Sequence, residues 1–220
     1  MIRHIYEKLL EIYGPQGWWP ITQGDTEPKY GVPLEDEEQR LEIILGTILT
    51  QNTSWNNAMK AIVNLKRKDM INKRKLLNAS QEELGKLIRS AGYFNQKAKK
   101  IRAFLENFPN DTEPERESLL KIWGIGPETA DSILLYAYNK PEFVVDAYTT
   151  RMFTTYGLIR DDMDYEEIKS VFQRALVAEY KERLIEIYKE YHALIVRHGK
   201  DYYSRRPHGL NDPLIKEIME

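Results

Sequence analysis

Apolar residues recur at helical spacing along most of the chain. The stretch LEIILGTILTQ at 41–51 has its apolar positions on one helical stripe: Leu41, Ile44, Leu45, Ile48 and Leu49. A second apolar stripe follows Ser80, which has Glu83 three positions later, as a capping box at a helix start requires. The same periodicity predicts further helices over 54–66, 95–107, 113–123, 127–138, 147–156, 165–180 and 182–198.

Strand patterns are nearly absent by comparison. The apolar, β-branched run FVV at 143–145 is too short to build a sheet, and the longest linker is the Gly- and Pro-rich stretch 20–34. No internal repeat or low-complexity tract interrupts the helical pattern. The sequence therefore predicts an all-α fold built from short helices.

Composition narrows the chemistry that this helical chain can perform. Hydrophobic residues make up 42% of the 220 residues, which is enough for a packed core. The chain has no cysteine, so disulfides, thiolate catalysis, Cys-ligated zinc and iron–sulfur clusters are excluded. A net charge of −2 does not indicate a nucleic-acid binder, so any DNA-binding surface must arise from local basic patches.

No segment has the pattern of a membrane anchor or a secretion signal. No apolar run reaches the roughly 18 residues that a membrane span needs, and the N-terminal stretch MIRHIYEKLLEIY is a charged amphipathic helix. We therefore expect a cytoplasmic protein without a membrane partner.

The most informative stretch is LLKIWGIGPETADSILLYAYNKPEFVVDAYTTR at 119–151. A helix ends at the Gly-Ile-Gly turn 124–126, and Pro127 suits the first position of the next helix. Outward-facing amides at such a helix start can hold a phosphate. One acidic residue, Asp146, follows the next apolar run and precedes another predicted helix.

Two parts of this stretch resemble the endonuclease III superfamily of DNA glycosylases. LLKIWGIGPETADSIL is similar to the superfamily's helix-hairpin-helix, and VVDAYTTR is similar to the segment that carries its catalytic aspartate. Three further segments, GWWP at 17–20, ILTQNTSW at 48–55 and GYFNQKAKKI at 92–101, narrow the resemblance to the endonuclease III-like 3-methyladenine DNA glycosylases, which lack an iron–sulfur cluster.

The resemblance implies two helical lobes with the active site in a cleft between them. A helical barrel would span 36–142 and carry the helix-hairpin-helix at 117–138, while 1–35 and 143–220 would form the second lobe. It also implies a monomer that acts on damaged double-stranded DNA and needs no cofactor. A monovalent cation at the hairpin carbonyls is the one candidate ligand.

Asp146 is the candidate catalytic residue on this resemblance. Breaking an N-glycosidic bond develops oxocarbenium character on the sugar, and a carboxylate can stabilise that cation and activate the attacking water. The alternative is purely structural, because an aspartate that precedes a helix commonly serves as its N-cap.

Glu128 distinguishes two types of glycosylase. Members that also cut the strand have a lysine in the pattern G-x-G-x-K-T, and this lysine forms a Schiff base with the sugar. The segment GIGPET has Glu128 at that position, and a carboxylate cannot form an imine. The resemblance therefore implies a monofunctional enzyme that uses water. The presence of Glu128 itself is explained by the helix dipole.

A flipped, methylated adenine needs an aromatic pocket, because the methylated ring is cationic and electron-poor. The resemblance makes Trp18, Trp19 and Pro20 the candidates for that base pocket. The alternative is that the two tryptophans pack between helices.

The resemblance also implies how the chain contacts a DNA duplex. Gln51 and Asn52 would fill the gap left by the flipped base, or else cap their helix. Tyr93 would intercalate opposite the lesion, or else be a partly buried tyrosine. Phosphates would be held by residues near Tyr93 and in the hairpin: Asn95, Lys97, Lys99, Gly124, Ile125, Gly126, Glu128 and Thr129. The basic run 64–75 is a further candidate, with an ordinary solvated surface as the alternative.

Lys200 matches a lysine in an HGK context that can be carbamylated in the cluster-free relatives. The tail RHGKDYYSRRP at 197–207 lies where other relatives keep their cluster, so something else must order it. A carbamate held by His198, Arg205 and Arg206 would do so. The alternative is an ordinary surface lysine.

These features predict a monofunctional DNA glycosylase that excises alkylated purines, chiefly 3-methyladenine, and leaves an abasic site. Two alternatives stay open: a glycosylase for mismatched or oxidised bases, and a non-catalytic helix-hairpin-helix DNA-binding protein. The two tryptophans and the missing lysine argue against the oxidised-pyrimidine type, and Asp146 argues against the non-catalytic protein.

Overall fold

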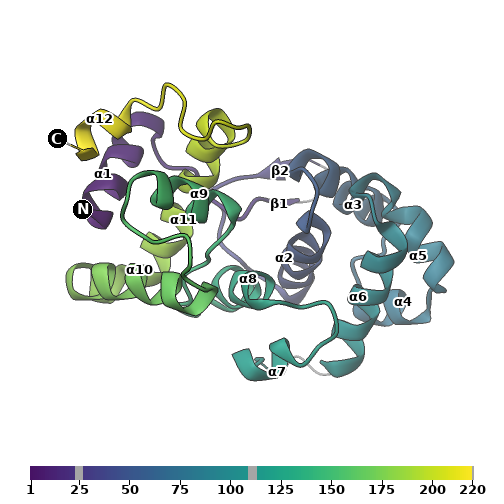
Figure 1. The fold of residues 1–220 in the computed structure, drawn as a ribbon. Coiled ribbons are helices and arrows are strands. Elements are labelled where there is room, and N and C mark those ends of the chain that lie inside the picture. Colours follow the sequence, from purple (N-terminus) through teal and green to yellow (C-terminus); the bar gives the residue numbers. More distant parts are fainter. Residues whose placement is uncertain (23–26, 109–112, 220) are drawn as a thin grey trace. The chain divides into compact units, whose positions relative to one another are not determined.

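Helices make up nearly all of the regular secondary structure of the described residues (Figure 1), which confirms the expected all-α class. The computed structural model describes residues 1–22, 27–108 and 113–219. Its α-helices are α1 (Ile2–Tyr13), α2 (Glu37–Thr50), α3 (Trp55–Arg67), α4 (Lys73–Asn78), α5 (Gln81–Leu87), α6 (Phe94–Asn107), α7 (Arg116–Leu120), α8 (Pro127–Ser132), α9 (Ala147–Thr155), α10 (Tyr165–Tyr180), α11 (Leu184–Tyr202) and α12 (Leu214–Met219). Short turns of 3₁₀-helix form η1 (Arg89–Ala91) and η3 (Lys181–Arg183), and η2 (Ile133–Ala137) is a π-helix. The strands β1 (Ile21–Thr22) and β2 (Pro28–Lys29) form one antiparallel pair.

The chain divides into two compact units. We call Trp19–Lys140 the central unit, and Met1–Trp18 together with Pro141–Glu220 the terminal unit. The first boundary falls between Trp18 and Trp19, whereas the sequence places it at residue 35. The difference arises because β1 packs on α2, so the segment that begins at Trp19 belongs to the central unit.

Helix α2 lies at the core of the central unit. All residues from 43 to 49 are buried, because the helix contacts α3, α6, α8, η2 and β1. The apolar stripe in the sequence therefore identifies the helix but understates its burial. A helix that is enclosed in this way is a rigid support for the residues that follow its C-terminal end.

Two contacts fix the start of the central unit against α2. The Glu42 carboxylate accepts hydrogen bonds from the Thr22 amide at 2.8 Å and from the Thr22 hydroxyl at 2.5 Å. Burial raises the pKa of Glu42, and these hydrogen bonds oppose that rise. A Cβ atom at Gly46 would lie 2.9 Å from Trp19 Cζ2, so a glycine is needed for the indole to lie on the helix.

Local signals predict most helix boundaries well. The capping box of Ser80 and Glu83 is present, and α10 spans the predicted residues behind its N-cap Asp164. Two predictions are wrong in detail. The helix expected over 113–123 is only α7, because the chain turns back where the Ile122 amide donates to Leu119 O. The helix expected over 127–138 widens from α8 into the π-helix η2.

An aromatic core holds the terminal unit together. Phe143 stacks on Phe172 with ring centroids 4.4 Å apart, and the buried Tyr191 donates its hydroxyl to Ile2 O at 2.7 Å. Both ends of the chain meet in this unit (Figure 1), where Lys8 of α1 forms an ion pair with Glu217 of α12 at 3.2 Å. Among the described helices, none combines the length and the apolar character that a membrane crossing demands.

Candidate functional site

Asp146 is the N-cap of α9 in the terminal unit. Its Oδ1 atom accepts hydrogen bonds from the Thr149 amide at 2.7 Å and from the Thr149 hydroxyl at 2.8 Å. The Asp146 amide lies 3.4 Å from the same hydroxyl, which completes a capping box. The capping role is therefore confirmed. It does not exclude catalysis, because the cap occupies only one carboxylate oxygen.

The second carboxylate oxygen of Asp146 faces His192 on α11. Oδ2 lies 4.0 Å from His192 Nε2, and the side chains of Asp146 and His192 are 12% and 13% exposed. Burial lowers the pKa of His192, and the Asp146 carboxylate partly opposes this. His192 is therefore neutral at pH 7. His192 carries no signal in the sequence, because only the packing of α9 on α11 brings it to Asp146.

Gly199 lets α9 and α11 approach closely enough to form this pair. A Cβ atom there would lie 2.5 Å from the ring of Tyr148 on α9. The glycine of the HGK motif is thus explained by helix packing.

Lys200 follows on the same helix and is exposed. Partial burial of its side chain lowers the pKa of Lys200, and Arg197 adds to that effect, while Asp201 and Asp146 raise it. A lowered pKa favours the neutral amine that reacts with carbon dioxide. Carbamylation of Lys200 stays a prediction.

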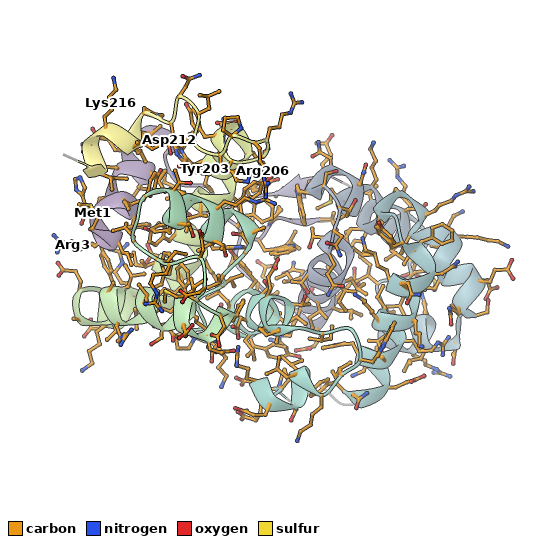
Figure 2. All side chains as sticks on the ribbon, in the orientation of Figure 1. Met1, Arg3, Tyr203, Arg206, Asp212 and Lys216 are labelled. Carbon is orange, nitrogen blue, oxygen red and sulfur yellow. The ribbon has the colours of Figure 1, made fainter. Side chains whose placement is uncertain are left out.

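A buried polar cluster anchors the C-terminal tail. The Asp212 carboxylate accepts hydrogen bonds from the hydroxyls of Tyr156 and Tyr203, both at 2.6 Å, and lies 3.0 Å from His198 Nε2. Figure 2 labels Tyr203 and Asp212 in this part of the terminal unit. Arg205 and Arg206, which were expected to help hold a carbamate on Lys200, are exposed, and that role stays a prediction, whereas His198 belongs to the buried cluster. The sequence signals were the histidine of HGK and the aspartate that follows the tail, which look ordinary without the fold.

The helix-hairpin-helix is formed by α7, the turn at 121–126 and α8 in the central unit. Arg116 of α7 binds the fully buried carboxylate of Asp131 of α8 with two hydrogen bonds, at 2.6 and 3.2 Å. Gly124 has a left-handed backbone with φ of 85°, and a Cβ atom there would lie 2.6 Å from Lys100. Gly126 has φ of −94° and open space beside it, so only the first glycine is required by the backbone.

The hairpin amides do not all match the phosphate-binding prediction. The Ile125 amide donates to Ile122 O at 3.1 Å and is used within the turn, so the prediction for this amide is wrong. For Gly126, Glu128 and Thr129 a phosphate contact stays a prediction. The carbonyl oxygens of Ile122 and Gly124 each accept one hydrogen bond and retain a second lone pair, which suits a monovalent cation.

Gln51 joins the end of α2 to the hairpin. Its Nε2 atom donates to Gly124 O at 3.2 Å and to Thr129 Oγ1 at 2.8 Å, and its Oε1 atom accepts from Lys100. In this conformation the side chain braces the hairpin and does not reach outward to fill a gap in a base stack.

Asn52 and Tyr93 occupy two exposed turns of the central unit. Both have left-handed backbones, with φ of 52° at Asn52 and 45° at Tyr93, and Tyr93 is 71% exposed. The expected wedge is therefore accessible, and the alternative of a partly buried tyrosine is wrong. Asn95 is exposed beside it, and the ammonium of Lys99 lies 4.3 Å from the ring centroid of Trp123 at the hairpin.

Lys97 does not bind phosphate as the sequence analysis expected. It is 2% exposed, and its ammonium donates to Leu49 O and Ala91 O, both at 2.8 Å. The signal was present in the sequence, because Lys97 falls on the same side of α6 as the buried residues Ile101 and Leu105.

The two candidate pocket tryptophans lie on either side of the unit boundary. Trp19 packs edge-on against Trp55 and Tyr136 at 5.2 and 5.1 Å, so its packing role is clear. Trp18 is half-buried and Pro20 is buried. Base binding by these three residues stays a prediction.

The basic run 64–75 is divided between ion pairs and a groove. Lys66 pairs with Glu38 and Lys75 with Asp69. Arg67 instead lines a groove of about 750 Å³ along α3, together with Lys60, Lys86 and Arg89. Within the described part of the chain, no three His, Asp or Glu side chains gather where they could hold a metal ion.

Comparisons with known proteins find relatives that match most of the chain. The family model described as "HhH-GPD superfamily base excision DNA repair protein" matches residues 45–193. A protein of Methanocaldococcus jannaschii with the provisional name of DNA repair glycosylase is 44% identical over 99% of this chain and 95% of its own length. Endonuclease III of Sulfolobus acidocaldarius is 30% identical over 74% of each chain.

Two solved structures share the fold of this chain over most of its length. The 3-methyladenine DNA glycosylase of H. pylori, bound to an ethenoadenine, has a TM-score of 0.74 and 28% identity, and the match covers 91% of this chain and 97% of that chain. A non-covalent complex of endonuclease III with DNA has a TM-score of 0.76 at 18% identity over 99% of this chain and 92% of that chain, which is evidence for the fold alone.

Proposed function

Because this chain belongs to the HhH-GPD superfamily of base excision DNA repair proteins, we propose that it is a monofunctional DNA glycosylase for alkylated purines. Its chief substrate would be 3-methyladenine in double-stranded DNA, and its product an abasic site. The observation that carries the proposal is the carboxylate of Asp146, whose Oδ2 atom is not used by the helix cap.

Asp146 would act when the N-glycosidic bond breaks. The sugar then carries positive charge, and a carboxylate near the anomeric carbon stabilises that charge and orients the attacking water. A neutral His192 leaves the field of the carboxylate undiminished. Position 128 offers a carboxylate and no amine, so no Schiff base can form there and water is the nucleophile.

The preference for alkylated purines rests on two lines of support. The H. pylori structure is of a 3-methyladenine DNA glycosylase, and its match to this chain covers nearly the whole length of both. A methylated adenine is cationic, and aromatic faces such as those of Trp18 or Trp19 attract such a ring by roughly 0.5–2 kcal/mol. Asn52, Tyr93 and the hairpin would hold the duplex around the extruded base.

A base-release panel tests the proposal. Methylated duplex DNA and duplexes with hypoxanthine, uracil or 8-oxoguanine are incubated with the enzyme, and the free bases are separated and identified. We expect 3-methyladenine to dominate, the strands to be cut only after alkali, and borohydride to trap no covalent complex.

Two variants make the panel decisive. Asp146→Asn should slow base release by at least about 100-fold. Glu128→Gln should still give no complex that borohydride traps, because neither side chain at position 128 is an amine. Release of only mismatched or oxidised bases would support the alternative substrate class. Duplex binding without any base release would support a non-catalytic protein.

A further inference from the structure

Two exposed turns of the central unit follow directly after helix ends. Asn52 comes just after α2, which ends at Thr50, and Tyr93 comes just after η1, which ends at Ala91. Both residues are exposed and both have left-handed backbones. A shared rigid support is needed if the two turns are to act together, because neither belongs to a regular element.

Lys97 supplies that support. Its ammonium donates to Leu49 O, in the last turn of α2, and to Ala91 O, at the end of η1, each at 2.8 Å. Its backbone amide donates to Tyr93 O at 3.0 Å. One residue therefore binds the ends of both helices and the tyrosine turn itself. A cation also suits these positions, because the C-terminal end of a helix carries partial negative charge.

The positive charge of Lys97 does not contribute to the stability of the fold. Burial, together with the nearby charge of Lys100, lowers the pKa of Lys97 to about 8. The charge that acts on Lys97 is that of Lys100. Within the described residues, no carboxylate forms an ion pair with the Lys97 ammonium. A pKa below the ordinary 10.5 means that the charged form destabilises the fold, so a buried ammonium is retained at a cost.

We propose that Lys97 is a positioning residue that holds the Asn52 and Tyr93 turns at a fixed spacing, so that both enter a damaged duplex together. This inference rests on the proposed function, since it assumes that the two turns insert at the lesion. Lys97 itself touches neither DNA nor the reacting atoms. Replacing Lys97 should therefore weaken the recognition of a duplex lesion, and this loss should depend on the presence of Tyr93.

A double-mutant cycle tests this coupling. Affinity for a duplex with an abasic-site analogue is measured for the wild type, Lys97→Met, Tyr93→Ala and the double variant. We expect Lys97→Met to lose about tenfold in duplex affinity, little in single-strand affinity, and almost nothing further in the Tyr93→Ala background. Lys169→Met is the matched control, because Lys169 is another buried lysine, paired with Glu142 in the terminal unit. It should lose stability without losing duplex affinity.

The pH dependence of the wild type gives a second test, and its main measurement does not depend on the folding of a variant. As the pH rises through about 8, the wild-type Lys97 loses its proton. Its charge then no longer holds the two helix ends, so duplex affinity should fall. The free energy of unfolding should instead rise toward pH 10, because the cost of the buried charge disappears. In Lys97→Met the fall in duplex affinity should be absent, and the rise in the free energy of unfolding should be smaller, because the lowered pKa values of Lys100 and Lys200 still contribute to it.

Three results would overturn the proposal that Lys97 positions the two turns. Additive losses in the cycle would mean that Lys97 acts only on overall stability. Equal losses on single strands and duplexes would mean the same. A duplex affinity that is flat between pH 7 and 9.5 in the wild type would show that the charge is not needed. If the wild type does not prefer the abasic duplex at all, the proposed function fails first, and that outcome is distinct from the other three.

Discussion

The terminal unit contains two aspartate–histidine pairs whose histidines are on the same helix. The two pairs differ in the distance between their side chains and in their burial. His192 and His198 are both on α11, and they face Asp146 and Asp212 respectively. The Asp146 pair is 4.0 Å apart and partly exposed, whereas the Asp212 pair is 3.0 Å apart and fully buried.

The difference lies in how the carboxylate oxygens are used. Asp212 accepts hydrogen bonds from Tyr156, Tyr203 and His198 and from the Leu214 amide, so both of its oxygens are occupied. Asp146 uses one oxygen for its helix cap and leaves the other beside a neutral imidazole. A saturated, buried carboxylate stabilises structure, and an unsaturated one at the surface is suited to chemistry.

Asp146→Asn should have the largest effect on function. Asparagine caps a helix about as well as aspartate, so the thermal midpoint should stay close to that of the wild type. Base release should fall by at least about 100-fold, because the negative charge is lost. Single-turnover base release and binding to an abasic duplex are measured together. Wild-type turnover in this variant would leave Asp146 as a helix cap only.

Asp212→Asn should have the largest effect on stability. The new amide would turn N–H groups toward hydroxyl and imidazole donors, and breaking such a buried pair costs about 3–5 kcal/mol. Urea unfolding and proteolysis of the tail measure the loss, while base release per folded molecule should change little. An unchanged free energy of unfolding would mean that the buried cluster does not anchor the tail.

The sequence predicts one of these pairs better than the other. Asp146 is recognisable because a local pattern, an apolar run followed by a helix start, places it after the hairpin. Asp212 gives no such signal, because its partners come from α9, α11 and the tail and meet only through tertiary packing. Helices were predicted because their period is local, whereas the burial of Lys97 and the π-helix η2 depend on neighbours far along the chain.

The HGK motif illustrates the same limit. His198 belongs to the buried cluster and Gly199 allows the contact with Tyr148, so packing accounts for two of the three residues. The resemblance pointed to Lys200, the residue whose role stays a prediction. A motif can therefore be recognised correctly while the reason for its residues comes from the fold.

His192→Gln should separate the two pairs by pH. The pKa of His192 lies below its ordinary 6.5, so as the pH falls below 6.5 the unfolded chain binds a proton first and the free energy of unfolding decreases. Burial raises the pKa of Asp212 but its hydrogen bonds outweigh this and lower it below 3.8, so its contribution is lost only in stronger acid.

A protonated His192 would also oppose the field of Asp146, so base release should fall on the same acid limb. Stability and rate are followed from pH 7.5 to 5 in the wild type and in His192→Gln. The glutamine cannot be protonated in this range, and both acid limbs should become shallower. If the pH profiles of stability and of base release are the same for the two proteins, His192 does not influence Asp146.

Lys200→Ala should have the smallest effect, and it decides what orders the tail. Lys200 is exposed, and the tail already has an anchor in Asp212 and the two tyrosines. The free energy of unfolding should change by no more than about 0.5 kcal/mol, as for most surface substitutions. Tail proteolysis should match the wild type, in contrast to Asp212→Asn.

Labelled bicarbonate and carbon NMR report separately whether a carbamate forms, and its presence should leave the proteolysis rate unchanged. A tail that is cut faster in Lys200→Ala, by as much as in Asp212→Asn, would restore Lys200 as an anchor and remove the contrast between the surface and the buried cluster.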